Sequence, residues 1–159
     1  MSETVCDTSP LQYLFQIDLL DVLPALYGPI VVPLAVVDEI DVGRRAGIRL
    51  PDVRLLPWAR LEAVDAGHID FPRLFGAGER DVLAFALKSP DSRVILDDAV
   101  ARRYASQAGL KVVGTIGILL LAKARGLVDS IAPFIEMLDS YGFRLHASTR
   151  ASALKLAGE

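Results

Sequence analysis

The sequence predicts an α/β domain built around a mostly parallel β-sheet. Short β-branched runs alternate along the chain with longer amphipathic runs of helical period, which is the pattern of repeated strand–helix–strand units. The chain has 159 residues, 52% of them hydrophobic, which fits one domain over residues 1–159 with a packed core that needs no disulfide. Internal repeats and linker-like segments are absent from the sequence.

In the first half of the chain, turn-forming residues separate the expected elements. Ser9 and Pro10 suit the N-cap and first position of a helix, and Gly28-Pro29 would end that helix. Pro33 would open the next helix. The expected order is strand, helix, strand, helix, at residues 4–6, 10–27, 30–32 and 33 to 43 or 47.

The pattern is weakest between residues 48 and 75 and becomes clear again afterwards. We expect a short strand at 53–56, a helix at 58–66 and a loop at 68–75. The remaining helices are expected at 79–89, 98–107, 116–125, 130–140 and 149–156, with strands at 94–96 and 111–113 and an edge strand at 143–145. In this reading Gly76-Ala77-Gly78 is a tight turn that presents Glu79.

Carboxylates stand where strands end or helices begin. Asp7 follows the first strand, and Asp97 and Asp98 follow the strand at 94–96. Open parallel sheets place functional groups at the carboxyl ends of their strands, so these acids should share one rim. Glu79, at a helix start, and Glu39, within the second helix, could face the same rim.

Each of these acids also has a purely structural alternative. Asp7 could form a turn, Asp98 could cap a helix, and Glu79 could complement a helix dipole. Glu39 could belong to a solvated helix face. Their joint placement along the chain favours a shared site.

Several neighbouring carboxylates repel one another unless a cation neutralises them. Oxygen ligands without histidine favour Mg²⁺ or Mn²⁺ over Zn²⁺. Such ions can orient and deprotonate a water molecule and stabilise phosphate oxygens, which requires no nucleophilic serine or cysteine. The metal ligands expected at this site are Asp7, Glu79, Asp97 and Asp98.

The charge of the chain limits the ways in which it could bind nucleic acid. The net charge is −3, which argues against a protein that coats nucleic acid by charge alone. Arginines are nevertheless concentrated in two places that could form an RNA track or merely face solvent: Arg44, Arg45, Arg49, Arg54 and Arg60, and then Arg102 and Arg103. A phosphotransfer domain with Asp7 as nucleophile is disfavoured, because Ser9 stands where a second aspartate would be needed.

Three features predict a cytoplasmic protein without a membrane segment. Cys6 is the only cysteine, so no internal disulfide can form, and this suits a reducing compartment. The N-terminus has neither the basic region nor the apolar region of a signal peptide. The most apolar stretch, residues 22–37, is interrupted by prolines and a glycine and does not read as a membrane span.

The ordered set of motifs resembles PIN-like domains, in a branch similar to VapC-type toxins. The resemblance covers about residues 4–158 and depends on the order of the motifs more than on any one of them. The motifs are Asp7-Thr8-Ser9-Pro10-Leu11, Glu39 in the helix after Ile30-Val31-Val32-Pro33, Gly76-Ala77-Gly78-Glu79, Leu96-Asp97-Asp98 and Gly114-Thr115-Ile116-Gly117.

This resemblance implies a three-layer α/β/α, Rossmann-like fold and an Mg²⁺- or Mn²⁺-dependent endoribonuclease. Asp7, Glu39 and Glu79 match the first three acidic positions of the family. The fourth is Asp97 or Asp98, and by strand offset Asp98 aligns better. The resemblance also implies polar helpers near the site, namely Thr8, Ser9 and Thr115. Toxins of this kind usually pair with a small antitoxin and often form homodimers; the alternative is a catalytically inactive module that binds RNA or protein.

Overall fold

Five parallel strands form the central sheet of the computed structural model, which describes residues 2–159 and therefore leaves out Met1, the first residue of the expected domain. The strands are β1 (Thr4–Cys6), β2 (Ile30–Pro33), β3 (Ala59–Glu62), β4 (Arg93–Ile95) and β5 (Lys111–Val113). Their spatial order is β3-β2-β1-β4-β5, and every neighbouring pair is parallel. The direction of winding reverses at β1, where open parallel sheets carry their functional crevice.

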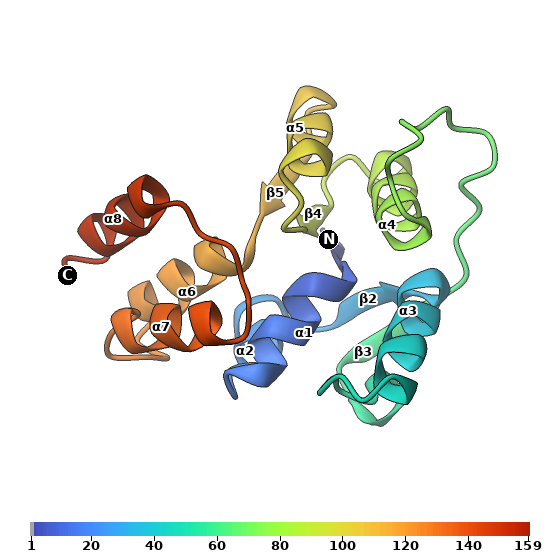
Figure 1. Cartoon of the computed structure of the whole chain (residues 1–159). Coiled ribbons are helices and arrows are strands. Elements are labelled where there is room, and N and C mark those ends of the chain that lie inside the picture. Colours follow the sequence, from blue (N-terminus) through green and yellow to red (C-terminus); the bar gives the residue numbers. More distant parts are fainter. Residues whose placement is uncertain (1) are drawn as a thin grey trace.

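Helices cover both faces of the sheet and complete the predicted three-layer α/β/α arrangement (Figure 1). They are α1 (Thr8–Gln16), α2 (Val22–Tyr27), α3 (Leu34–Arg45), α4 (Ala77–Lys88), α5 (Ala99–Gln107), α6 (Thr115–Ala124), α7 (Ala132–Ser140) and α8 (Ala147–Leu156). Helices α1, α2 and α6 lie on one side and α4 and α5 on the other, while α3 contacts both α1 and α4. No helix within residues 2–159 has the length and apolar character needed to cross a membrane.

The core follows from the apolar composition of the inner strands. Val5, Val31 and Val94 are almost completely buried, as is expected where helices cover both faces of a parallel sheet. β3 is only partly buried because it forms one edge of the sheet. The predicted strands at 4–6, 30–32, 94–96 and 111–113 are confirmed to within a residue at either end.

The predicted first helix differs from the structure at its start and in its middle. Asp7 is the N-cap, and the helix begins at Thr8 rather than at Pro10. The helix is also divided in two, because Asp18 adopts a left-handed backbone conformation with φ 59° between α1 and α2. Aspartate is one of the few residues that tolerate this conformation, and here it ends the hydrogen-bond ladder of α1.

Residues 53–66 were predicted wrongly. The expected strand at 53–56 is a short 3₁₀ helix, η1 (Val53–Leu55), in which Asp52 accepts a hydrogen bond from the backbone N–H of Arg54 at 3.2 Å. The expected helix at 58–66 is instead occupied by β3, which pairs with β2. Here pairing with an existing strand overrides the local preference of the sequence, as is common for edge strands.

The edge strand predicted at 143–145 is also wrong, since β3 and β5 form the two edges of the sheet. This segment connects α7 to α8 without regular structure. It is held by the backbone N–H of Phe143, which donates to Leu138 O at 3.0 Å, and by the Phe143 ring, which meets Tyr13 edge-on at 4.9 Å between centroids.

Candidate functional site

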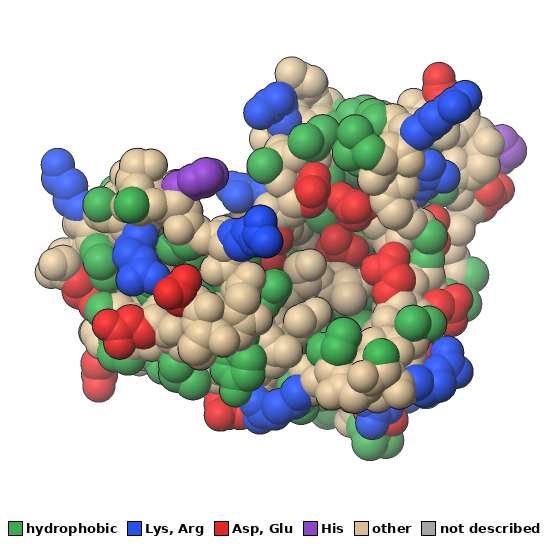
Figure 2. Space-filling view, in the orientation of Figure 1, with side chains coloured by type: hydrophobic (Ala, Val, Ile, Leu, Met, Phe, Trp, Pro, Cys, Tyr) green, Lys and Arg blue, Asp and Glu red, His purple; other side chains and the backbone are tan. Residues whose placement is uncertain are grey.

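Acidic side chains gather on the rim where the carboxyl ends of β1 and β4 meet the starts of α1, α4 and α5. Figure 2 shows Asp and Glu side chains across the middle of this face, over a hollow in the surface. Asp7 follows β1, Asp97 and Asp98 follow β4, Glu79 belongs to the first turn of α4, and Glu39 lies on α3. The topology therefore brings all the predicted acids to one rim.

Asp7 is the most deeply placed of these acids, with 6% of its surface exposed. Its Oδ1 atom is buried and has no hydrogen-bond partner among the described residues. The pKa of Asp7 is raised to about 7, mainly by burial and also by the negative charges of Glu39, Glu79 and Asp97, against the opposing effect of the Thr8 backbone N–H. The four carboxylates are thus close enough to disfavour one another's ionisation.

Glu39 reaches from α3 to two other helices. The Thr8 hydroxyl donates to Oε2 at 2.7 Å, and the Gly78 backbone N–H donates to Oε1 at 2.7 Å. A Cβ atom at position 78 would lie 2.5 Å from the same Oε1. Gly78 is therefore a site residue that the sequence does not reveal, because Gly76-Ala77-Gly78 indicates only a turn.

Glu79 occupies the third position of α4 and helps to hold the start of that helix. The predicted turn at 76–78 is in fact the N-terminus of the helix, with Gly76 as N-cap. The Gly76 backbone N–H donates to Glu79 Oε1 at 3.2 Å, while Oε2 is buried without a partner in the described chain. Burial raises the pKa of Glu79, as do the charges of Asp98 and Glu39.

Asp97 is held by the residues that follow β5. The backbone N–H and the hydroxyl of Thr115 donate to its two carboxylate oxygens, each at 2.7 Å. Burial raises the pKa of Asp97, against the opposing effects of Thr115 and Arg102. A Cβ atom at position 114 would lie 2.9 Å from Asp97 Oδ1, so Gly114 makes room for this carboxylate.

Asp98 is more exposed and caps α5, accepting a hydrogen bond from the Ala101 backbone N–H at 2.9 Å. Its charge raises the pKa of Glu79, whereas the charge of Asp97 raises that of Asp7. The two neighbouring aspartates thus face different members of the cluster. Among the predicted polar helpers, Thr8 and Thr115 contact a carboxylate of the site, whereas Ser9 makes no such hydrogen bond among the described residues.

The donor set fits a divalent cation of the Mg²⁺ type. It consists of carboxylate oxygens, and two of them, Asp7 Oδ1 and Glu79 Oε2, are buried and lack partners in the described chain. Within residues 2–159 no three His, Cys, Asp or Glu side chains already stand in an arrangement that could hold a metal ion. Glu39 and Asp97 are engaged by hydrogen bonds, so an ion would draw first on Asp7 and Glu79.

Most arginines of the first predicted RNA track are paired with acids of the chain. The pairs are Arg44–Asp52 at 3.5 Å, Arg49–Asp18 at 2.9 Å, Arg54–Asp41 at 2.7 Å and Arg60–Glu62 at 2.7 Å. Little uncompensated positive charge is therefore left there for a phosphate backbone. Arg45, Arg102 and Arg103 form no ion pair within residues 2–159.

A groove of about 580 Å³ opens directly from the acidic rim and runs between α6 and α8. Asp97 and Arg102 line its inner end, and Phe143, Arg144 and His146 line its outer wall. Arg144 forms no ion pair in the described chain. This wall is not predicted from the sequence, because the apolar pattern of residues 143–145 indicates a strand.

A three-layer α/β/α domain with acids at the carboxyl ends of its parallel strands belongs to the open, Rossmann-like class of α/β proteins. A family model described as a PIN domain matches residues 3–159, and the chain therefore belongs to the PIN-domain family. This family generally comprises nucleases, which typically use divalent metal ions. No curated protein matches the chain.

Proposed function

We propose that this protein is an endoribonuclease that requires Mg²⁺ or Mn²⁺ and hydrolyses RNA phosphodiester bonds. The observation that carries the proposal is the buried Asp7 carboxylate, which has an unpartnered oxygen and lies in the field of three further carboxylates. Burying mutually repelling acids is costly unless a cation or proton offsets the charge. A divalent cation would relieve the repulsion and satisfy the buried oxygens.

In this proposal Asp7, Glu79 and the aspartate after β4 hold the ion. When bound, the ion would supply an activated water molecule and would stabilise negative charge on the phosphate. Glu39 orients the water, because Thr8 and Gly78 hold its carboxylate at the rim of the site. Thr115 fixes the carboxylate of Asp97 through two hydrogen bonds.

We assign Asp97 as the fourth acid in preference to Asp98. Asp97 is held by Thr115, it lies in a space left open by Gly114, and its charge acts on Asp7. One carboxylate oxygen of Asp98, Oδ1, already accepts the hydrogen bond that caps α5. Its charge still acts on Glu79, so it contributes to the field of the site.

The groove between α6 and α8 is the proposed path of the RNA. It combines unpaired arginines at its inner and outer ends with an apolar wall that includes Phe143. Positive charge together with stacking surface is the combination that binds single-stranded nucleic acid. Arg102 and Arg144 would neutralise phosphates on either side of the scissile bond, and Arg45 and Arg103 would contribute at longer range. Arg44 would contribute less, because its charge is offset by Asp52.

The resemblance to VapC-type toxins extends the proposal to partners. We infer a toxin that is neutralised by a small antitoxin and that forms a homodimer. Leu55 and Leu156 are each more than three-quarters exposed, which provides apolar surface for such contacts. Light scattering of the purified chain would test the dimer, and a monomer at all concentrations would exclude it.

The nuclease proposal is tested by incubating single-stranded and structured RNAs with the purified protein in Mn²⁺, in Mg²⁺ and with a chelator. Asp7→Asn serves as the matched variant because it removes the charge and keeps the shape. We expect cleavage that requires the metal and is lost in Asp7→Asn. Equal cleavage by both proteins, or none by either at high protein concentration, would contradict the proposal.

One observation favours a second candidate, a catalytically inactive module that binds RNA or protein. Glu39 and Glu79 both accept backbone N–H groups at the start of α4, so both have a structural role without any metal. Calorimetry distinguishes the two functions. Heat from Mn²⁺ binding that disappears in Asp7→Asn supports the nuclease, and no binding supports the inactive module.

A further inference from the structure

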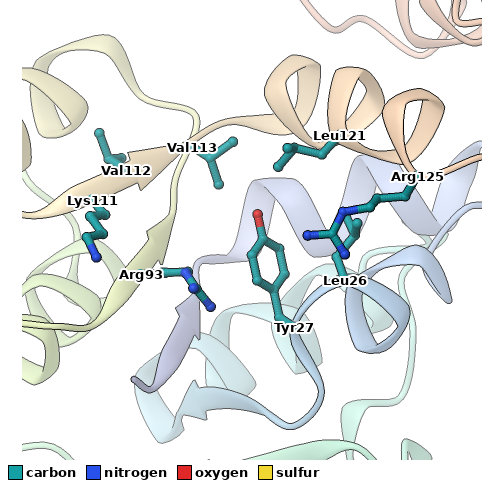
Figure 3. Close-up of a pocket in the computed structure, with 8 residues that line it drawn as sticks. All are labelled: Leu26, Tyr27, Arg93, Lys111, Val112, Val113, Leu121 and Arg125. Atoms are coloured by element: carbon teal, nitrogen blue, oxygen red, sulfur yellow. The ribbon is translucent and has the colours of Figure 1, made fainter. Parts of the chain in front are cut away.

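A second cavity, of about 300 Å³, is lined by residues of α2, β4, β5 and α6 and by Arg125 (Figure 3). Arg93 and Lys111 are the first residues of β4 and β5, and Arg125 directly follows α6. Asp97 lies beyond the other end of β4. None of the acids at the rim lines this cavity, so the cavity is distinct from the carboxylate cluster.

The three cations of this cavity are Arg93, Lys111 and Arg125. Within residues 2–159, Arg93, Lys111 and Arg125 take part in no ion pair and no side-chain hydrogen bond. The backbone oxygen of Glu3 accepts from the Arg93 N–H at 2.8 Å, but the Glu3 carboxylate turns to Arg60 at 3.1 Å. Although the net charge of the protein is −3, such a group of unpaired cations creates a positive potential that attracts anions to this cavity.

Tyr27 stands between two of these cations and points its hydroxyl into the cavity (Figure 3). The Arg93 guanidinium lies over its ring, with Cζ 5.7 Å from the centroid. Burial raises the pKa of Tyr27, with Arg93 and Arg125 opposing, so the hydroxyl stays protonated at neutral pH. It can therefore donate a hydrogen bond to an anion.

The rest of the cavity is apolar and includes an open strand edge. Leu26, Val113 and Leu121 supply the apolar wall. β5 is an edge strand, and Val113 O accepts from Leu96 N–H of the inner neighbour. Backbone groups alternate sides along a strand, so the N–H and C=O of Val112 face the open edge, where Val112 also lines the cavity.

We propose that this cavity binds the terminal phosphate of a nucleotide, either a free nucleoside monophosphate or the phosphorylated 5′ end of an RNA. A guanidinium group can donate two parallel hydrogen bonds to two oxygens of one phosphate. Three cations also match the double charge of a terminal phosphate better than the single charge of a carboxylate. The apolar wall receives the sugar and base. The volume is at the lower end of the range, about 300–1,000 Å³, of small-molecule sites.

The test is calorimetry of the whole chain in phosphate-free buffer with AMP, inorganic phosphate and adenosine. We expect AMP to bind and the two partial ligands to bind at least tenfold more weakly. Arg93→Gln and Arg125→Gln should each weaken AMP binding at least tenfold with unchanged melting temperature, since both side chains are exposed. Arg73→Gln, an exposed arginine outside the cavity, is the control and should leave AMP binding unchanged.

Displacement of bound AMP then distinguishes the two sources of the phosphate. A 5′-phosphorylated oligoadenylate that displaces AMP assigns the site to an RNA end, and failure to displace it assigns the site to the free nucleotide. Equal displacement by the 5′-hydroxyl oligoadenylate would overturn the proposal. So would the absence of AMP binding at millimolar concentration, or AMP binding that is unchanged in both glutamine variants.

Discussion

At the scale of single residues, the missing side chain of Gly78 decides where the Glu39 carboxylate can lie. An added Cβ would meet Oε1 at 2.5 Å, whereas at Gly76 it would meet Glu79 Oε1 at an ordinary 3.7 Å. Because the displaced group is the end of a flexible side chain, Gly78→Ala should fold but lose at least tenfold in RNA cleavage. Gly76→Ala, matched in size, should keep most of the activity. Equal activity of the two variants in a cleavage assay would show that the position of Glu39 is not important.

Asp7 should make the metal-free protein less stable as the pH rises. Its folded pKa, about 7, is above the ordinary value of 3.8, so its contribution to stability is complete below that ordinary value and is lost as the pH rises toward 7. With chelator present we expect Asp7→Asn to be more stable than the natural chain at pH 8, by roughly 1–4 kcal/mol. Denaturant unfolding should show this difference shrinking to near zero by about pH 4. A difference that grows toward acid pH would contradict this assignment.

At the scale of elements, Thr115 connects the start of α6 to the acid that follows β4. Thr115→Val removes the hydroxyl that donates to Asp97 Oδ2 and leaves a partly buried carboxylate oxygen without this donor. We expect the free energy of unfolding to fall by about 1–3 kcal/mol and RNA cleavage to decrease as well. Thr115→Ser keeps the hydroxyl, so it should retain most of the stability, measured by thermal unfolding, and most of the RNA cleavage, measured by activity assay. If valine and serine behave alike, the hydroxyl does not position Asp97.

The roles of Asp97 and Asp98 in cleavage can also be distinguished with a matched pair of variants. Asn at position 98 can still cap α5, so Asp98→Asn should change stability by less than about 0.5 kcal/mol and should retain substantial cleavage. Asp97→Asn should lose cleavage to the level of Asp7→Asn. Parallel cleavage assays of the two variants decide the assignment, and the reverse ranking would make Asp98 the fourth acid.

The sequence was sufficient to predict the elements whose local pattern and final environment agree. The strands with continuous β-branched runs, such as Ile30-Val31-Val32, were found because they are buried on both faces. β3 was missed because Ala59–Glu62 is a half-exposed edge whose strand character comes from pairing with β2. Residues 143–145 were misassigned because the apolar ring of Phe143 packs on Tyr13 of α1 instead of on a sheet.

For the candidate site, the sequence placed the acids on one rim but could not orient them. Consecutive residues at the end of a strand point in different directions, so choosing between Asp97 and Asp98 requires knowing what lies beside each. That neighbour is Gly114-Thr115, which comes from the next strand along the chain. Likewise, the roles of Gly78 and Arg144 depend on contacts between distant segments, which composition and spacing do not encode.

At the scale of the whole molecule, a net charge of −3 requires that RNA be bound through a local positive region. In an Asp7→Asn background, which prevents cleavage, Arg144→Gln should weaken single-stranded RNA binding and lower the slope of log affinity against log salt by about 0.7–1. Arg54→Gln removes the same charge from an arginine already paired with Asp41 and should leave the slope nearly unchanged. Fluorescence anisotropy over a range of salt concentrations measures both. A larger change for Arg54→Gln would move the RNA path to α3.

The hydrogen bonds at the start of α4 also bear on how this family evolves. Glu39 and Glu79 would remain useful to a descendant that had lost all activity, because Gly76 and Gly78 would still need acceptors for their N–H groups. Selection for folding alone would then preserve two of the acids that are used to recognise an active member. Asp7 is less tied to the fold, since its side chain makes no cap hydrogen bond and its buried Oδ1 has no partner among the described residues. The presence or absence of this aspartate is therefore a better marker than Glu39 or Glu79 for separating catalytically active members of the family from inactive ones.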